Sequence, residues 1–287
     1  MRGVILAGGS GSRLFPLTAV TSKQLLPVFD KPMIHYPLAA LMLAGLRDFV
    51  MITTEKHRGA YQSLLRDGRQ WGISIEYRIQ SEPRGIAEAV SIGADAFSDS
   101  GAVLVLGDNL FYGAGFSEDL LSTYVPGTAQ VFGYRVANPR DYAVAELDED
   151  GTVMDIVEKP LIPRSDVAVP GIYVLPQDAP DLVQSLQPSP RGELEITDLN
   201  RMYLAQGRLV LKQLSRGTAW LDTGTFAGLH DASTFVRVVQ ERQGTRVACL
   251  EEIAFRRGFI DEDGLEACAL EATDDLRQYL SRMLLNP

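Results

Sequence analysis

The 287-residue sequence has few cysteines and histidines. Its two cysteines, Cys249 and Cys268, are too few for a disulfide framework and lack the spacing of a zinc site. Both are expected to be reduced, packed thiols of a cytoplasmic protein. The three histidines are dispersed at His35, His57 and His230, so each is more simply structural or superficial than catalytic. No Ser/His/Asp set is clustered in the sequence.

The sequence also lacks a long hydrophobic run and an excess of positive charge. No apolar run is long enough to cross a membrane, and the N-terminus leads into a predicted strand without a secretory pattern. The formal net charge of −10 argues against a general nucleic-acid-binding surface. The electrostatic field of this negative charge would repel an anionic substrate, so local cations and a metal ion must bind such a substrate. We expect one large domain with an appended segment, and no membrane or nucleic-acid partner.

A glycine-rich stretch near the N-terminus is the most informative motif. It follows an apolar run at 4–6 that is typical of a buried strand. The glycines of Gly8-Gly9-Ser10-Gly11 allow a sharp turn and close approach to a ligand. Successive N–H groups in such a turn bind anions, and Arg13 and Lys23 add two cations. This pattern favours a polyphosphate-binding loop over a plain strand-to-helix turn.

Two better-known phosphate-binding motifs fit this stretch poorly. A P-loop ends in Gly-Lys-Ser/Thr, which is absent here. A dinucleotide-binding G-x-G-x-x-G motif could begin at Gly9, but Leu14 occupies its third glycine position. Asp30 lies near the distance expected for a ribose-binding acid, so a NAD-dependent dehydrogenase stays open as an alternative of a different class.

The first half of the chain alternates predicted strands and helices. Strands are expected at 4–6, 49–52, 73–79 and 103–106, and helices at 33–46, 60–65 and 86–97. This alternation predicts a doubly wound α/β fold, in which ligands bind at the carboxyl ends of the strands. Three loops follow strand ends and should converge on one crevice: 8–13, 80–85 and 107–109.

The middle of the chain changes character. The sequence predicts a hairpin of strands at 143–147 and 152–157, a proline-punctuated loop at 160–170, a strand at 171–174, and helices at 178–186 and 197–206. We expect a Rossmann-like catalytic domain with a mixed sheet and a small β insertion at 1–240. A helical C-terminal segment is expected at 241–287.

Two aspartates are candidate Mg²⁺ ligands. Asp108 ends the apolar run 103–106, and Asp222 lies between Trp220-Leu221 and Thr223-Gly224. Mg²⁺ prefers one or two carboxylates plus phosphate oxygens, which aspartates at the tips of two distant strands could supply. From the residues alone, a turn- or helix-capping role for each aspartate is about equally plausible.

The segments 8–14 and 21–33 closely resemble the sugar-phosphate nucleotidylyltransferases, and the resemblance extends over nearly the whole chain. Within this family they are most similar to thymidylyltransferases that act on glucose 1-phosphate. The resemblance implies that dTTP and glucose 1-phosphate give dTDP-glucose and pyrophosphate, as the first step of dTDP-deoxysugar biosynthesis, for example of rhamnose. Arg13 would neutralise the leaving pyrophosphate and Lys23 would align the phosphates. Asp108 and Asp222 would hold Mg²⁺.

The resemblance also implies binding residues. Those for the nucleotide are Leu6, Gly8, Gly9, Gly11, Ser12, Gln24, Gln80, Pro83 and Gly85. Those for the sugar are Ile86, Tyr142, Ala143, Glu158, Lys159, Val169 and Glu195. The amide of Gln80 can both donate and accept, which matches the imide edge of thymine or uracil, and Gly85 would let the backbone approach the base. Thr197 is expected to be a helix N-cap. Ala143 replaces the family's glycine, a departure that concerns the sugar rather than the reaction.

The C-terminal segment resembles that of the longer members of the family, where it contributes to tetramer contacts and to a second nucleotide-sugar site. Tyr112, Glu252 and Arg256 are candidates for that site, and a homotetramer is expected; simple helical packing is the alternative. UTP or a modified sugar phosphate stays open as an alternative substrate. A non-catalytic nucleotide-sugar sensor also stays open, although it would need a broken active site.

Overall fold

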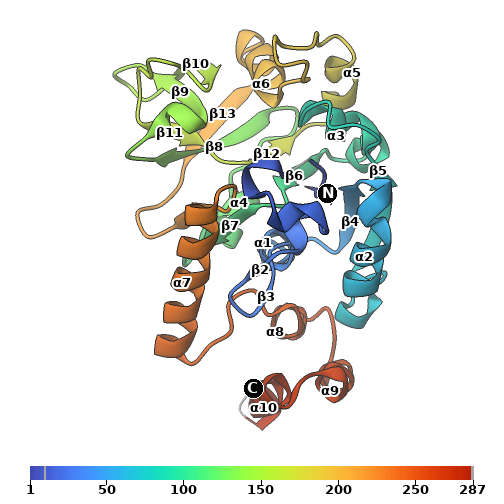
Figure 1. The fold of residues 1–287 in the computed structure, drawn as a ribbon. Coiled ribbons are helices and arrows are strands. Elements are labelled where there is room, and N and C mark those ends of the chain that lie inside the picture. Colours follow the sequence, from blue (N-terminus) through green and yellow to red (C-terminus); the bar gives the residue numbers. More distant parts are fainter. Residues whose placement is uncertain (10, 286–287) are drawn as a thin grey trace.

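A computed structural model describes residues 1–9 and 11–285 and contains a ten-stranded mixed sheet (Figure 1). Its strands are β1 Arg2–Leu6, β4 Asp48–Thr53, β5 Ser74–Ile79, β6 Ala102–Leu106, β8 Ala129–Arg135, β9 Ala143–Leu147, β10 Val153–Glu158, β11 Val167–Val169, β12 Ile172–Leu175 and β13 Leu209–Gln213. They follow the order β10-β9-β11-β8-β12-β6-β1-β4-β5, and β13 pairs with β8. Neighbouring strands from β6 to β5 are parallel.

Two short antiparallel ribbons, ten α-helices and six short 3₁₀ helices complete the described ranges. The ribbons pair β2 Pro27–Val28 with β3 Lys31–Pro32, and β7 Asn109–Tyr112 with β14 Ala219–Asp222. The helices are α1 His35–Leu43, α2 Glu55–Leu65, α3 Ala87–Ile92, α4 Phe116–Ser122, α5 Ala179–Val183, α6 Ile196–Ala205, α7 Phe226–Gln243, α8 Leu250–Arg256, α9 Glu262–Glu271 and α10 Asp274–Leu285.

The sheet separates two hydrophobic cores. Successive side chains of a strand point to opposite faces, so β1 places Ile5 in one core and Val4 and Leu6 in the other. Residues of α1 and α8 pack on the Ile5 side, and residues of α3, α5 and α6 pack on the opposite side. Helices on both faces of a largely parallel centre confirm the predicted doubly wound, Rossmann-like α/β fold.

Several predicted elements differ from the structure in informative ways. The helix predicted at 60–65 is longer in the structure and begins at Glu55. Its first turns face solvent and carry no apolar pattern, so the sequence did not reveal them. The helix predicted at 86–97 is interrupted at Gly93. The prediction of a loop over 160–170 is wrong for residues 167–169, which form the strand β11, buried between β8 and β9. Strands β8 and β13 were not predicted from the sequence.

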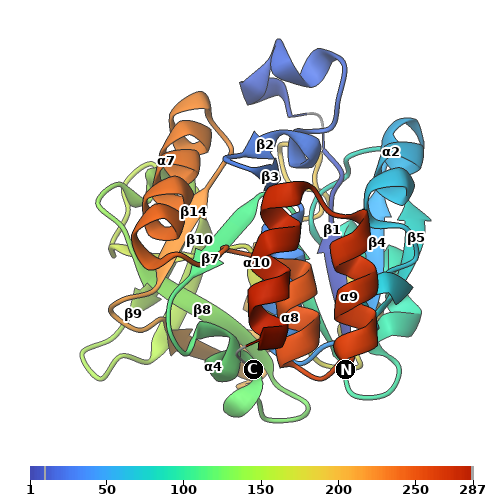
Figure 2. The ribbon, with the colours of Figure 1, turned by 90° about the horizontal axis from the view of Figure 1, so that it is seen from below.

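The two ends of the molecule have different roles in the architecture. The strands β9, β10 and β11 lie with α6 at one end, as an extension of the main sheet, and α8, α9 and α10 lie at the opposite end (Figure 1). Figure 2 shows the last three helices side by side. The predicted boundary after residue 240 falls inside α7, which continues to Gln243 and is capped by the left-handed Gly244.

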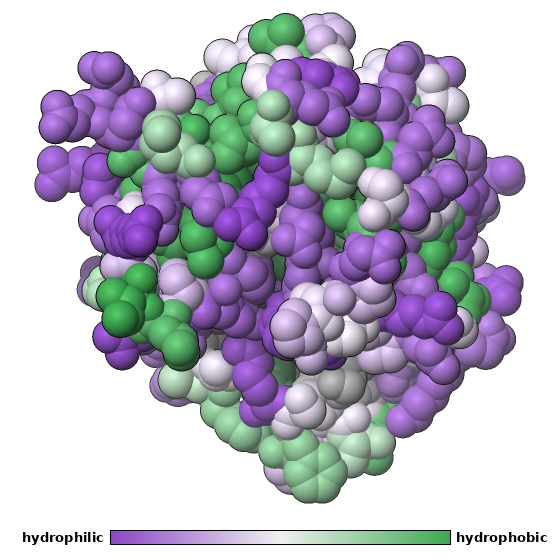
Figure 3. All heavy atoms as spheres, turned by 90° about the horizontal axis from the view of Figure 1, so that it is seen from above, coloured by the Kyte–Doolittle hydropathy of each residue, from purple (hydrophilic) through white to green (hydrophobic). Residues whose placement is uncertain are grey.

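The surface is mainly hydrophilic on the face shown in Figure 3, where apolar residues form separate groups. Within residues 1–9 and 11–285, no helix combines the length and the apolar composition needed to span a membrane.

Candidate active site

A buried ion pair lies where β6 ends. Lys23 lies on a short 3₁₀ helix, Lys23–Leu25, and its ammonium group contacts the carboxylate of Asp108. The Lys23 side chain is only 8% exposed. The other carboxylate oxygen of Asp108 accepts a hydrogen bond of 2.9 Å from the Asn109 amide. Two residues far apart in sequence are thus fixed together at the carboxyl end of the parallel strands.

The β7–β14 ribbon brings the second aspartate to the same place. Asp222 lies directly opposite Asn109 in this ribbon, so it is next to Asp108. Its carboxylate accepts a hydrogen bond of 2.9 Å from the backbone of Gly224. A Cβ placed on Gly224 would lie 2.6 Å from an Arg13 guanidinium nitrogen, which puts that guanidinium beside Asp222. The structure therefore brings together the four predicted catalytic residues.

Electrostatics differ between the two aspartates. Burial alone would raise the pKa of Asp108, but the charge and hydrogen bond of Lys23, together with the hydrogen bond from Asn109, lower that pKa below its ordinary value. Burial and then the negative charge of Asp108 raise the pKa of Asp222, against the opposing effects of Lys23 and Arg13. Lys23 and Arg13 do not fully offset burial and repulsion at Asp222, so a cation bound between the two carboxylates would stabilise its ionised form.

Asn109 is a buried organising residue that the sequence analysis missed. Its amide oxygen accepts hydrogen bonds from the Trp220 indole, at 2.6 Å, and from the Gly171 backbone, at 3.1 Å. Its amide nitrogen donates to Asp108. Asn109 thereby connects the first metal-ligand candidate to β14 and to the start of β12. The signal available in sequence was its position directly after Asp108, at a strand end.

The glycine-rich loop follows β1 as predicted. Gly9 and Gly11 both have positive φ angles, of 100° and 58°. A Cβ on Gly8 would lie 2.6 Å from the side-chain oxygen of Gln80, so this glycine permits close packing of two loops. Ser12 and Arg13 follow as exposed residues of a 3₁₀ turn, Ser12–Leu14. Leu6 is at the end of β1, and Ser10 lies outside the described residues.

Gln24 supports this loop from behind. It is 4% exposed, its amide nitrogen donates to the Gly8 carbonyl at 3.2 Å, and its amide oxygen accepts from the Ser22 hydroxyl at 2.7 Å. The Tyr61 hydroxyl closes the same buried network, 2.8 Å from that of Ser22. In this arrangement Gln24 fixes the loop backbone, and its predicted direct contact with a nucleotide stays a prediction.

The loop after β5 carries the predicted base-reading residues. Gln80 is buried beside Gly8 and donates to Glu88 at 2.7 Å, whereas Pro83 is exposed at the loop surface. Gly85 has a φ angle of 107°, and a Cβ there would overlap the carbonyl oxygen of Leu194. Close packing against the Leu194 backbone therefore requires glycine at position 85. The predicted approach of the Gly85 backbone to the base stays a prediction.

Replacing Gly85 by alanine should lower the free energy of unfolding by about 3 kcal/mol, because both the positive φ and the contact with Leu194 disfavour a side chain. Denaturant unfolding would measure the change. Gly127→Ala is the matched control, since Gly127 also has a positive φ, of 83°, but has open space around it. Equal losses in the two variants would contradict the packing explanation.

The predicted sugar-site residues converge on β9, β10 and β11. Ala143 pairs with Glu158 on one side and with Val169 on the other. The Tyr142 ring packs against Trp220 at a tilt of 60°, with ring centroids 4.8 Å apart, and the Tyr142 carbonyl accepts a hydrogen bond from the Lys159 backbone. This group adjoins the candidate cluster, because Trp220 lies two residues before Asp222 in β14. Burial, and then the charge of Asp222, raise the pKa of Tyr142. Ile86 is at the start of α3, next to Gly85.

Arg191 joins the two predicted sugar-binding carboxylates and was missed by the sequence analysis. It donates to Glu195 at 2.8 Å and lies 3.4 Å from Glu158. Glu195 is 6% exposed and also accepts a hydrogen bond of 2.7 Å from the Ser189 hydroxyl. The predicted cap role of Thr197 is wrong, because α6 begins one residue earlier and the Thr197 hydroxyl instead donates to Glu158 at 2.7 Å.

The three residues predicted for a second site share one pocket of about 510 Å³ between β7, α1 and α8. The Tyr112 hydroxyl donates to Gln243 at 3.0 Å, and Arg256 donates to Glu252 at 2.8 Å. Apolar residues of α1 and α4, including Leu43 and Phe116, line the rest of the cavity.

The dinucleotide-binding alternative does not fit the structure. Leu14 is fully buried, and the glycine-rich loop leads into a three-residue 3₁₀ turn instead of a long helix. Asp30, considered as a ribose-binding acid, lies at the tip of the β2–β3 hairpin and binds Arg246. Neither feature required by a dehydrogenase fingerprint is therefore in place.

Known proteins match this chain over most of its length. Residues 2–238 match the family described as nucleotidyl transferase. The chain is 52% identical over 284 residues to a glucose-1-phosphate thymidylyltransferase of Xanthomonas campestris pv. campestris (strain B100), covering 98% of this chain and 96% of that protein. It is 51% identical over 272 residues to a glucose-1-phosphate thymidylyltransferase of Mycolicibacterium smegmatis, covering 94% of each.

Solved structures agree with these matches. A Bacillus anthracis protein assigned as a glucose-1-phosphate thymidylyltransferase, in complex with a sucrose, aligns with a TM-score of 0.77 and 38% identity. The alignment covers 83% of this chain and 95% of that one. A UDP-glucose pyrophosphorylase complexed with UDP-glucose aligns with a TM-score of 0.72 and 24% identity, over 83% of this chain and 98% of that one, and shows the shared fold.

Proposed function

This chain belongs to the nucleotidyl transferase family, and on that premise we propose that it forms dTDP-glucose and pyrophosphate from dTTP and glucose 1-phosphate. The observation that carries the proposal is the cluster of Arg13, Lys23, Asp108 and Asp222 at the carboxyl ends of the central strands. The sensor alternative is not favoured, because this cluster is complete.

The reaction needs positioning and charge neutralisation more than a protein nucleophile. A phosphate oxygen of glucose 1-phosphate attacks the α-phosphorus of dTTP, and the bond to the bridging oxygen breaks as pyrophosphate leaves with the electron pair. Arg13 is exposed and has no hydrogen-bond or ion-pair partner among the described residues, so it is free to neutralise pyrophosphate. Lys23 would align the two substrates' phosphates. The attacking oxygen is already ionised, so no general base is required.

Asp108 and Asp222 would hold Mg²⁺ in this proposal. The donor set fits this ion, which prefers one or two carboxylates and completes its shell with phosphate oxygens and water. In the part of the chain that the structure describes, no group of three or more His, Cys, Asp or Glu side chains could hold a metal unaided. When bound, the ion supplies neutralisation of the phosphate charge.

Pyrophosphate release from glucose 1-phosphate and dTTP tests the proposal, with UTP compared in parallel. Activity with dTTP should be only about fivefold above that with UTP, because the thymine methyl group is worth about 1 kcal/mol of apolar burial. Folded protein that releases no pyrophosphate with either nucleotide would refute the proposed reaction. Release only with another sugar phosphate would reassign the sugar and implicate Ala143.

We further infer that the pocket of Tyr112, Glu252 and Arg256 binds a nucleotide sugar and regulates activity. Its apolar wall and its paired polar side chains suit an amphipathic ligand of that kind. A homotetramer with cytoplasmic location, and the division of the chain into residues 1–240 and 241–287, remain predictions. Measurement of the mass in solution would test the homotetramer. Inhibition by added nucleotide sugars would test the regulatory role of the pocket.

A further inference from the structure

Asp30 forms a charged hub at the tip of the β2–β3 hairpin, away from the catalytic cluster. One carboxylate oxygen accepts from Arg246 at 3.2 Å and from the Gln240 amide at 3.1 Å. The other accepts from Lys31 at 2.6 Å. The side chains of Asp30 and Arg246 are each only 20% exposed, so this ion pair is substantially shielded from solvent.

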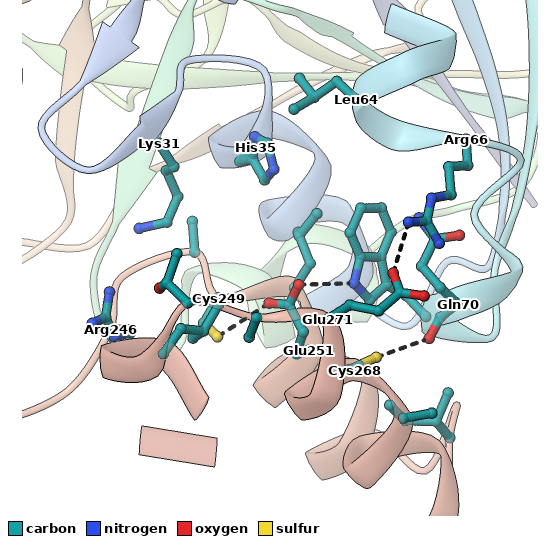
Figure 4. Close-up of a pocket in the computed structure, with 18 of the residues that line it drawn as sticks. Lys31, His35, Leu64, Arg66, Gln70, Arg246, Cys249, Glu251, Cys268 and Glu271 are labelled. Atoms are coloured by element: carbon teal, nitrogen blue, oxygen red, sulfur yellow. Dashed lines mark hydrogen bonds and ion pairs between the residues drawn. The ribbon is translucent and has the colours of Figure 1, made fainter. Parts of the chain in front are cut away.

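Arg246 connects this hub to the C-terminal helices. Its guanidinium group also contacts Asp275 of α10 and lies over the Tyr279 ring, 5.8 Å from the centroid. Lys31 and Arg246 occupy the same end of the pocket of about 640 Å³ between the hairpin and these helices (Figure 4). The tip of the hairpin is therefore attached to the C-terminal segment as well as to α7, through Gln240.

The other end of the hairpin is attached to the catalytic lysine. Beyond the two strand pairs, the backbone continues to pair, with Met33 N–H donating to the Leu26 carbonyl at 2.9 Å and Ile34 N–H donating to the Gln24 carbonyl at 2.9 Å. Gln24 is the neighbour of Lys23 in the 3₁₀ turn. A tilt of the hairpin would thus move the backbone from which the Lys23 side chain extends to Asp108.

We propose that Asp30 is a positioning residue for catalysis: by binding Arg246 and Gln240 it fixes the tip of the hairpin whose base fixes Lys23. This inference rests on the proposed role of Lys23 in the reaction. Asp30 touches no reacting group in this scheme. Its effect on the rate arises because small displacements of a charge-aligning group from its productive geometry slow a phosphoryl-type transfer strongly.

Asp30→Ala should lower kcat about tenfold while leaving the KM values for dTTP and glucose 1-phosphate within about twofold. The isosteric Asp30→Asn should fold with the least disturbance and show a smaller loss in the same sense, about threefold, because its amide oxygen can still accept from Arg246. Asp275→Asn is the matched control, since it removes a different, exposed carboxylate partner of the same arginine. It should retain kcat within about twofold.

Steady-state kinetics and thermal unfolding of the full chain decide the question. Loss of kcat in both Asp30 variants, with intact KM values and with Asp275→Asn unaffected, supports the positioning role. A kcat within twofold of the original in both Asp30 variants overturns it. An equal effect of Asp275→Asn overturns it as well, because the loss would then come from general loosening of the C-terminal helices. Near-normal turnover of Lys23→Ala in the same assay would instead refute the proposed role of Lys23.

Discussion

Lys23→Ala should release pyrophosphate about a thousandfold more slowly than the original protein, because it removes a preorganised cation from the position where the two substrates' phosphates must meet. The loss should fall mainly on kcat. A coupled assay for pyrophosphate at saturating dTTP and glucose 1-phosphate would measure it. Lys212→Ala, on β13 and outside the site, is the control and should retain turnover. A Lys23→Ala variant within tenfold of the original rate would contradict the assigned role.

The same substitution should also destabilise the metal-free protein near neutral pH. Lys23 lowers the folded-state pKa of Asp108, so the ion pair contributes stability above the unfolded pKa of that aspartate and loses it as the pH falls through the lower folded value. Removal of the ammonium group leaves a buried carboxylate without its partner, at a cost of about 3 kcal/mol. The stability difference from the original protein should shrink on acidification.

Asp222→Asn should lower turnover about a thousandfold and, in contrast, stabilise the metal-free protein. The rate falls because one of the two candidate Mg²⁺ ligands loses its charge. Burial and then the charge of Asp108 raise the folded-state pKa of Asp222. The original protein therefore loses stability as the pH rises from the unfolded-state pKa through this higher folded-state value, because the folded state must then hold an unfavourable carboxylate. An uncharged amide removes this penalty at neutral pH.

Thermal unfolding with a metal chelator, beside the turnover assay, would test both parts of the Asp222 prediction. Asp231→Asn is a suitable control, because Asp231 is exposed on α7 and outside the site. It should change neither quantity. A lower midpoint for Asp222→Asn than for the original protein in chelator would show that Asp222 is not a repelled carboxylate. Opposite signs of the Lys23 and Asp222 effects on stability would be difficult to obtain from nonspecific damage.

Local sequence patterns indicated where three residues of the candidate cluster lie. The glycines, Arg13 and Lys23 lie within one short stretch after a buried strand, and Asp108 directly follows another. Parallel strands bring their carboxyl ends to one edge, so the residues that follow β1 and β6 lie close together in space although they are far apart in the chain. The placement of Asp222 needed the resemblance to known enzymes, because only the pairing of β14 with β7 brings it to that edge.

Contacts between distant segments were not predictable in the same way. Arg191 reads as an ordinary surface arginine until Glu158 and Glu195 are seen on either side of it. The demand for glycine at position 85 comes from Leu194, a residue far along the chain. β11 was read as part of a loop because its three residues are too few for a periodic signal, and only burial between two other strands makes it a strand.

The β7–β14 ribbon has a thermodynamic consequence. It carries Asp222 opposite Asn109 at one end and pairs Tyr112 with Ala219 at the other, so a single short ladder connects the candidate metal-binding carboxylates with the second pocket. A ligand that binds Tyr112 more tightly in one twist of the ribbon than in another would change the separation of the carboxylates. Reciprocity then requires cation binding at the aspartates to change the affinity of that distant ligand by the same factor.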